Sequence, residues 1–323
     1  SNTLACSTRN GTTNTFGNGA SGHATIGGAD GELIAFESLA TNLSAGFTDG
    51  NGATKADVWL RNVGSNGLGT STQLVSHAVG NAAIGGDDAS EAPALAASGE
   101  AIAFESDATN LVAADTNTQR DVFFAAGTTS PFTKVRASVG AAGLEANGAS
   151  RAASIHATGG RTRVAFESDA TNLATTTAAT NVFLFDSDGS GSTTLLNQRI
   201  TATATTIGNG SARAPVISND AATMAFESDA SNIEVFDTAR PDTNGTTDIF
   251  LVETSLLAQG RVLPFRVTIT ANDSAASNGA STAPAFGVFA GSTNYPTGFL
   301  TYRTAATNLG TSDTSNVMVS FLA

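Results

Sequence analysis

The stretch Ile34-Ala35-Phe36-Glu37-Ser38 decides the fold, because its last four residues recur along the chain. Regular self-similarity indicates a repeat architecture, in which each copy is one supersecondary unit. The recurring tetrapeptide Ala-Phe-Glu-Ser stands at 35–38, 103–106, 165–168 and 225–228, and an altered copy, Thr-Tyr-Arg-Thr, stands at 301–304.

Each copy is followed by a second landmark, Ala-Thr-Asn-Leu or a close variant, at 40–43, 108–111, 170–173, 230–233 and 306–309. Alternation within the first copy puts Ile34, Phe36 and Ser38 on one face of a strand and Ala35 and Glu37 on the other. The pattern therefore predicts a β-strand at every copy.

Three further strands are expected in each unit, bounded by Gly, Asn, Asp and Ser. One precedes the tetrapeptide and opens with an Asn-Gly-Ala-Ser-like turn. A third strand follows at 57–60, 121–124, 181–184, 248–251 and 316–319, and a fourth at 73–76, 134–137, 195–200 and 266–269. No window keeps a 3.6-residue apolar period, so almost no helix is expected.

The last unit lacks a fourth strand, and Thr3–Ser7 at the start of the chain has the right character to supply it. We therefore predict one all-β domain over 1–323, a five-bladed β-propeller of four-stranded antiparallel blades closed by the N-terminal strand. Such radial sheets leave only short, protected edges. The expected blades are approximately 18–80, 87–142, 147–205, 209–272, and 278–323 plus 1–10.

These repeats resemble the TolB-like, WD-like β-propeller repeat of exported bacterial proteins. The resemblance is carried by 34–38 and its copies, by the Ala-Pro elements Ala92–Leu95 and Ala214–Ile217, and by the Asp-Val-Phe third strand. It covers the whole chain and implies a propeller fold. It implies little about function, because the family includes binding, assembly and accessory modules.

Composition excludes some classes of function. The chain has 323 residues, 15 Lys plus Arg against 28 Asp plus Glu, and a formal net charge of −13. A nucleic-acid binder needs clustered basic residues, so none is expected, and no apolar run is long enough to span a membrane. The single cysteine, Cys6, excludes an intramolecular disulfide. The wealth of Thr, Ser, Asn, Gly and Ala favours a protein outside the cell or at its surface, with the periplasm as the alternative.

The recurring glutamate invites a catalytic interpretation, because glycoside hydrolases use pairs of carboxylates. A residue present in four of five units is better interpreted as architectural, hydrogen-bonded to the neighbouring blade or to a turn. The three histidines, His23, His77 and His156, lie in different units and are expected at the surface or in turns.

Two loops carry oxygen ligands at alternate positions, a pattern that suits Ca²⁺. Asp and Asn are also ordinary residues of turns and strand starts, so no cofactor is certain and calcium is the one cofactor hypothesis. The candidate ligands are Asp115, Asn117, Asp121, Asp242, Asn244 and Asp248, and the first unit has a stretched copy at 49, 51 and 57.

The residue that opens the first strand of each unit varies, and innermost strands border a propeller's channel. Glu91, Arg151 and Arg213 are therefore the candidate binding residues at the channel rim; solvated rim charges are the alternative interpretation.

The regularity of the repeats favours a non-enzymatic, exported interaction or structural module that binds a protein partner or copies of itself. Two alternatives stay open. One is a carbohydrate-binding or glycoside-hydrolase propeller with a glycan ligand, and the other is a periplasmic accessory propeller that docks a partner protein.

Overall fold

A computed structural model describes residues 7–10, 13–64, 71–176, 180–187, 192–196, 198–234, 241–270, 275–287, 299–309 and 317–321. The chain divides into two compact units. One comprises Ser1–Val164 with Phe185–Ser192, and the other comprises Ala165–Leu184 with Thr193–Ala323.

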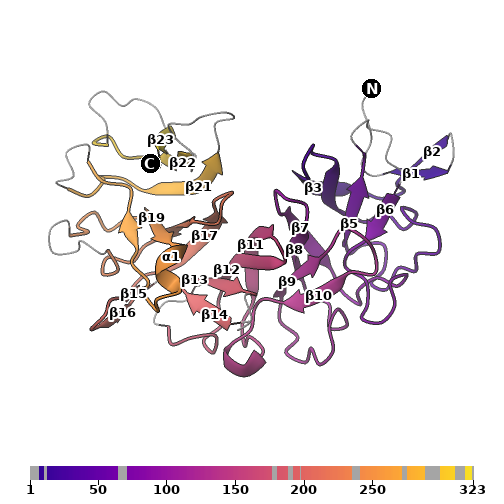
Figure 1. The fold of residues 1–323 in the computed structure, drawn as a ribbon, viewed down its shortest axis with the longest axis horizontal. Coiled ribbons are helices and arrows are strands. Elements are labelled where there is room, and N and C mark those ends of the chain that lie inside the picture. Colours follow the sequence, from indigo (N-terminus) through magenta and orange to yellow (C-terminus); the bar gives the residue numbers. More distant parts are fainter. Residues whose placement is uncertain are drawn as a thin grey trace. The chain divides into compact units, whose positions relative to one another are not determined.

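Five antiparallel sheets repeat one plan, in which strands that follow one another in sequence are neighbours in the sheet (Figure 1). The first sheet has β3 (Ser21–Gly27), β4 (Leu33–Ser38), β5 (Asp57–Asn62) and β6 (Ser71–Leu74). The second has β7 (Ser90–Leu95), β8 (Ala101–Ser106), β9 (Asp121–Ala126) and β10 (Thr133–Arg136).

The remaining three sheets follow the same order along the chain. The third has β11 (Ser150–Thr158), β12 (Arg161–Ser168), β13 (Asn181–Asp186) and β14 (Ser192–Leu195). The fourth has β17 (Ala212–Ile217), β18 (Thr223–Ser228), β19 (Asp248–Glu253) and β20 (Phe265–Arg266). The fifth has β21 (Ser281–Gly287), β22 (Phe299–Thr304) and β23 (Val317–Phe321).

The alternation of Ala and Phe explains how neighbouring sheets pack. In the first unit, Ala35 of the first sheet lies in one buried cluster with Phe104 and Phe123 of the second sheet. In the second unit, Ala225 packs in the same way with Tyr302 of the following sheet. A small side chain on one face therefore leaves room for the aromatic side chain of the next sheet, which gives the close packing that protein interiors require.

Helix is nearly absent from the described residues, as expected. They contain one 3-10 turn, η1 (Ala141–Gly143), and one short helix, α1 (Thr254–Leu257). None of the helices described has the length and apolar character needed to cross a membrane.

Two expectations about strands need correction or remain open. The predicted fourth strand over 195–200 is wrong, because β14 ends at Leu195 and β15 (Gln198–Ile200) pairs instead with β16 (Thr205–Ile207). Of the predicted closing strand, Thr3–Cys6 lie outside the described residues. Ser7 begins β1 (Ser7–Asn10), which pairs with β2 (Thr13–Phe16). The closed ring and the number of blades remain predictions.

Candidate functional site

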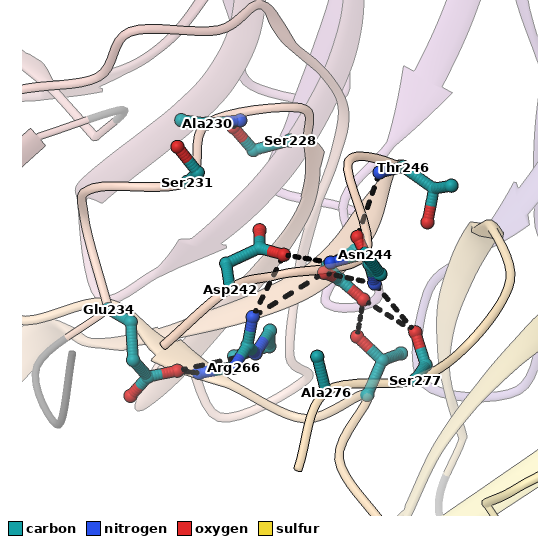
Figure 2. A network of polar contacts seen from close by, with 12 residues as sticks. Ser228, Ala230, Ser231, Glu234, Asp242, Asn244, Thr246, Arg266, Ala276 and Ser277 are labelled. Atoms are coloured by element: carbon teal, nitrogen blue, oxygen red, sulfur yellow. Dashed lines mark hydrogen bonds and ion pairs between the residues drawn. The ribbon is translucent and has the colours of Figure 1, made fainter. Parts of the chain in front are cut away.

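The candidate calcium ligands of the fourth sheet surround a buried arginine (Figure 2). The Arg266 side chain is fully buried, with Nη1 3.4 Å from Asp242 Oδ1 and 3.7 Å from Asp248 Oδ2. Asp248 Oδ1 also accepts hydrogen bonds from the hydroxyls of Thr268, at 2.5 Å, and Ser277, at 3.0 Å. Burial raises the pKa of Asp248 to about 6.

The second sheet repeats this arrangement around Arg136. Arg136 Nη1 lies 3.0 Å from Asp115 Oδ1, 3.3 Å from Asp121 Oδ2 and 2.8 Å from Glu145 Oε1. Charges this deeply buried are stable only when they are paired and hydrogen-bonded. Each arginine therefore provides the positive charge that its carboxylates need.

The two asparagines of these clusters turn their amide N–H groups, not their oxygens, toward the aspartates. Asn117 Nδ2 donates to Asp121 Oδ2 at 2.9 Å, and Asn244 Nδ2 donates to Asp248 Oδ2 at 3.1 Å. Their Oδ1 atoms accept backbone N–H groups two residues further on, which fixes the amide orientation.

The structure thus brings the six candidate ligands together as two salt-bridged networks, and calcium at these loops remains a prediction without geometric support. Within the described ranges, no group of three or more His, Cys, Asp or Glu side chains is arranged to hold a metal ion.

The equivalent position in the first sheet lacks the arginine, because Leu74 stands where the other two sheets have Arg136 and Arg266. Asp57 is buried there and accepts a hydrogen bond from Ser76 Oγ at 2.8 Å. Burial, with a smaller contribution from the charge of Asp49, raises the pKa of Asp57 to about 7.

The recurring glutamates bind the backbone of the following sheet, which confirms their architectural interpretation. Each accepts a hydrogen bond from the N–H of an alanine with positive φ in the first strand of the following sheet. In β7, β17 and β21 this alanine lies at a bulge. The pairs are Glu37 with Ala92 at 2.9 Å, Glu105 with Ala152 at 2.7 Å, Glu167 with Ala214 at 2.9 Å and Glu227 with Ala283 at 2.7 Å.

The candidate rim residues Glu91 and Arg213 are both engaged in ion pairs. Arg213 Nη2 lies 2.6 Å from Asp229 Oδ2, with both side chains about two-fifths exposed. Glu91 Oε2 lies 3.1 Å from Arg120 Nη1. The third candidate, Arg151, lies on β11 and is half-buried.

Arg120 is the residue that sequence reasoning missed. Its guanidinium binds both oxygens of Asp107, at 3.0 and 2.5 Å, and its Nη1 also lies 3.4 Å from Glu105 Oε2. The only signal in the sequence is an exchange between repeats: the second repeat has Glu91 and Arg120 where the third repeat has Arg151 and Thr180.

We define the acidic row as His23, Glu37, Glu91, Glu105, Asp107 and Arg120, all within the first compact unit. Exposed His23 donates a hydrogen bond from Nδ1 to Glu37 Oε1 at 2.7 Å, and that contact raises the pKa of His23. Glu91 and Glu105 raise it further, so these groups share one electrostatic environment. Burial raises the pKa of Glu105.

No protein family model matches the sequence, and no curated protein matches it. Solved structures resemble it more distantly. TolB from Acinetobacter baumannii is 12% identical with a TM-score of 0.40, and the match covers 93% of this chain and 56% of that one. A thermostable family-43 glycoside hydrolase is 12% identical with a TM-score of 0.40, covering 96% and 93% of the two chains. The endo-arabinase from Bacteroides thetaiotaomicron is 14% identical with a TM-score of 0.37, covering 93% of each.

The prediction that the chain is not an enzyme is therefore corrected. It inferred a lack of catalysis from regular repeats, yet the solved structures of similar fold include glycoside hydrolases. The repeats are also less uniform than the prediction assumed, because Glu91 and Arg120 are peculiar to the second repeat.

Proposed function

We propose that the chain is an interaction module, and that its acidic row binds a cationic segment of a partner protein. The observation that carries the proposal is the charge of the row: four carboxylates are matched by one guanidinium and one imidazole.

The row is accessible at its charged groups. The exposed fractions are 70% for the His23 side chain, 40% for Glu91, 36% for Asp107 and 29% for Arg120. Half-buried Glu37 and buried Glu105 bind the backbone beneath, so a ligand would meet a fixed surface. Complementary charge of this kind raises association rates and selects partners of opposite sign.

Two other occupants fit the row less well. A second copy of this chain would bring another acidic surface toward it, and the net charge of −13 makes that approach unfavourable. A glycan would be neutral in the simplest case and would make little use of the excess negative charge.

The location of this module is part of the proposal. We infer from the composition that it acts outside the cell, at its surface or in the periplasm. Immunodetection in cytoplasmic, periplasmic, surface and medium fractions tests this, and a purely cytoplasmic signal would overturn it.

The binding proposal is tested by calorimetric titration of the full chain with an Arg-Gly repeat decapeptide. We compare Glu91→Gln/Asp107→Asn with the matched pair Asp30→Asn/Glu100→Gln, which removes the same charge at the hairpin turns at the other end of these strands. The first pair should weaken binding by at least about tenfold and the second by less than about twofold.

Salt supplies the second criterion, because binding by charge must weaken as ionic strength rises. If the two double variants weaken peptide binding equally, only the net charge of the chain matters, and the acidic row is not a specific binding site. A neutral oligosaccharide that binds the row with an affinity independent of salt would replace the proposal with the glycan alternative.

A further inference from the structure

A second feature of the first compact unit, separate from the acidic row, is a pocket of about 490 Å³ beside β10. Its walls come from three segments: residues 77–82 after the first sheet, 111–113 after β8, and 131–134 at the start of β10. The volume is in the range of small-molecule sites. In a chain with 28 acidic residues, none of the lining residues is an aspartate or glutamate.

His77, expected from its sequence context at the surface or in a turn, is buried in the pocket wall. Its Nδ1 lies 2.9 Å from the carbonyl oxygen of Ala78, and its Nε2 lies 3.1 Å from the backbone nitrogen of Phe132. The carbonyl can only accept and the N–H can only donate, so Nδ1 carries the proton and Nε2 does not. Burial also lowers the pKa of His77, so the ring is neutral.

The Lys134 side chain lines the same pocket beside His77. Its Nζ lies 3.0 Å from Nδ1 and 3.2 Å from Nε2 of His77. Both nitrogens already have hydrogen-bond partners, the carbonyl of Ala78 and the N–H of Phe132. The ring therefore offers the ammonium no free acceptor, and the N–H donors of the ammonium stay available. Within the described part of the chain, Lys134 makes no ion pair.

Apart from Asn81 and Thr133, the remaining lining residues are apolar or glycine. Leu111 and Phe132 are buried, Val112 packs against the core, and Val79 is 54% exposed at the opening. A single ammonium without an adjacent arginine or a cluster of backbone N–H groups suits one singly charged group better than a phosphate dianion.

We propose that this pocket binds a small monocarboxylate with an apolar body, its carboxylate on Lys134 Nζ and its hydrocarbon part against Val79, Val112 and Phe132. The ligand carboxylate would supply the acceptor that the ammonium lacks, and the apolar part would cover a surface now open to water.

The chain offers a direct test because it has only two lysines, Lys55 and Lys134. Lysine labelled with ¹³C at Cε gives two signals in the full-length protein, which the variants Lys55→Met and Lys134→Met assign. Titration with octanoate should shift the Lys134 signal saturably and leave the Lys55 signal in place. Lys55 is the matched control because it is already paired with Asp88 at 2.8 Å.

Affinity measurements complete the test. Lys134→Met should weaken octanoate binding by at least about tenfold, whereas Lys55→Met should change it by less than about twofold. The neutral analogue 1-octanol should bind at least about tenfold more weakly than octanoate. Equal binding of 1-octanol, equal shifts of both lysine signals, or unchanged affinity of Lys134→Met would each overturn the proposal.

A pair of valine variants tests the site without changing the lysine. Val79→Glu places a carboxylate at the opening and should weaken octanoate binding by about tenfold through competition for the ammonium. Val135→Glu is the control, because Val135 is exposed on the neighbouring position of β10 and does not line the pocket. Equal effects of the two variants would contradict a specific role of the pocket.

Discussion

The position that opens the third strand shows how one residue type acquires different properties from its surroundings. Asp57, Asp121 and Asp248 are all buried. Each accepts a hydrogen bond from a hydroxyl group, and the donors are Ser76, Ser138 and Thr268 in that order. Asp121 and Asp248 also face an arginine, whereas Asp57 does not. The third sheet avoids the charge altogether with Asn181.

The first prediction concerns Asp57→Asn. The pKa of Asp57 in the folded chain, about 7, exceeds its ordinary value. The stabilisation that comes from the protonated carboxyl is therefore complete below about pH 4 and is lost as the pH rises through 7. Relative to the wild type, Asp57→Asn should gain about 2–3 kcal/mol between pH 5 and pH 8.

Urea denaturation at the two pH values measures this gain. The control is Asp121→Asn, which removes a partner of Arg136 and should destabilise the chain at pH 8. A difference between Asp57→Asn and wild type that stays the same at both pH values would show that Asp57 does not titrate in this range.

The second prediction concerns Arg266→Leu, which copies the leucine of the first sheet into the fourth. It leaves Asp242 and Asp248 buried without their cation, so the free energy of unfolding should fall by about 3–5 kcal/mol. Arg213→Leu breaks an exposed pair and should lower it by at most about 1 kcal/mol. Chemical denaturation measures the free energy of unfolding of both variants. Similar losses would mean that the buried network contributes no more stability than an exposed ion pair.

At the scale of elements, the first strand of the second to fifth sheets contacts the preceding sheet through one alanine with a strained backbone. Ala92, Ala152, Ala214 and Ala283 have φ between 49° and 54°, a region that L-residues other than glycine seldom adopt. The N–H of each alanine donates to the glutamate of the preceding sheet. The hydrogen bond to a carboxylate offsets the strain.

A pair of glycine substitutions in β7 tests this account. Ala92→Gly relieves the positive φ and should raise the free energy of unfolding by about 0.5–1 kcal/mol. Ala94→Gly, two residues along the same strand in extended backbone, should lower it by a similar amount. Thermal unfolding compares the two, and destabilisation by both would show that the backbone at Ala92 is not strained.

The strands that repeat could be predicted from the sequence, because their alternation reflects packing that recurs in every sheet. The asparagine landmark also has a repeated cause: Asn42 Oδ1 accepts the N–H of Asn18, and Asn232 and Asn308 do the same for Asn209 and Asn278.

The end of the third sheet could not be predicted, because an outer strand has only one neighbour and its continuation can pair with the next segment. Arg120 escaped notice because its partners lie 13 to 29 residues away in other elements.

At the scale of the whole molecule, positive charge is scarce, and several basic residues are held by carboxylates or line a pocket. Among the 15 basic residues, Arg136 and Arg266 lie in buried networks, Arg120 binds three carboxylates and Lys134 lines a pocket. With 28 acidic residues against 15 basic ones, carboxylates outnumber cations along the chain. This supports a cationic partner at the acidic row, and it makes an uncompensated ammonium such as that of Lys134 unusual in this chain.

Closure of the repeat array by the N-terminal strand is the prediction that only the whole molecule can answer. The chain has one cysteine, Cys6, in the predicted closing strand, and two methionines, of which Met318 lies on β23 and Met224 on β18. If Thr3–Ser7 adds to β23, adjacent strands about 5 Å apart bring Cys6 close to Met318. A nitroxide on Cys6 should then broaden the Met318 methyl signal strongly and leave that of Met224 sharp. Reduction of the nitroxide should restore the lost signal, and a Met318 signal that the spin label does not broaden would show that the array is not closed in this way.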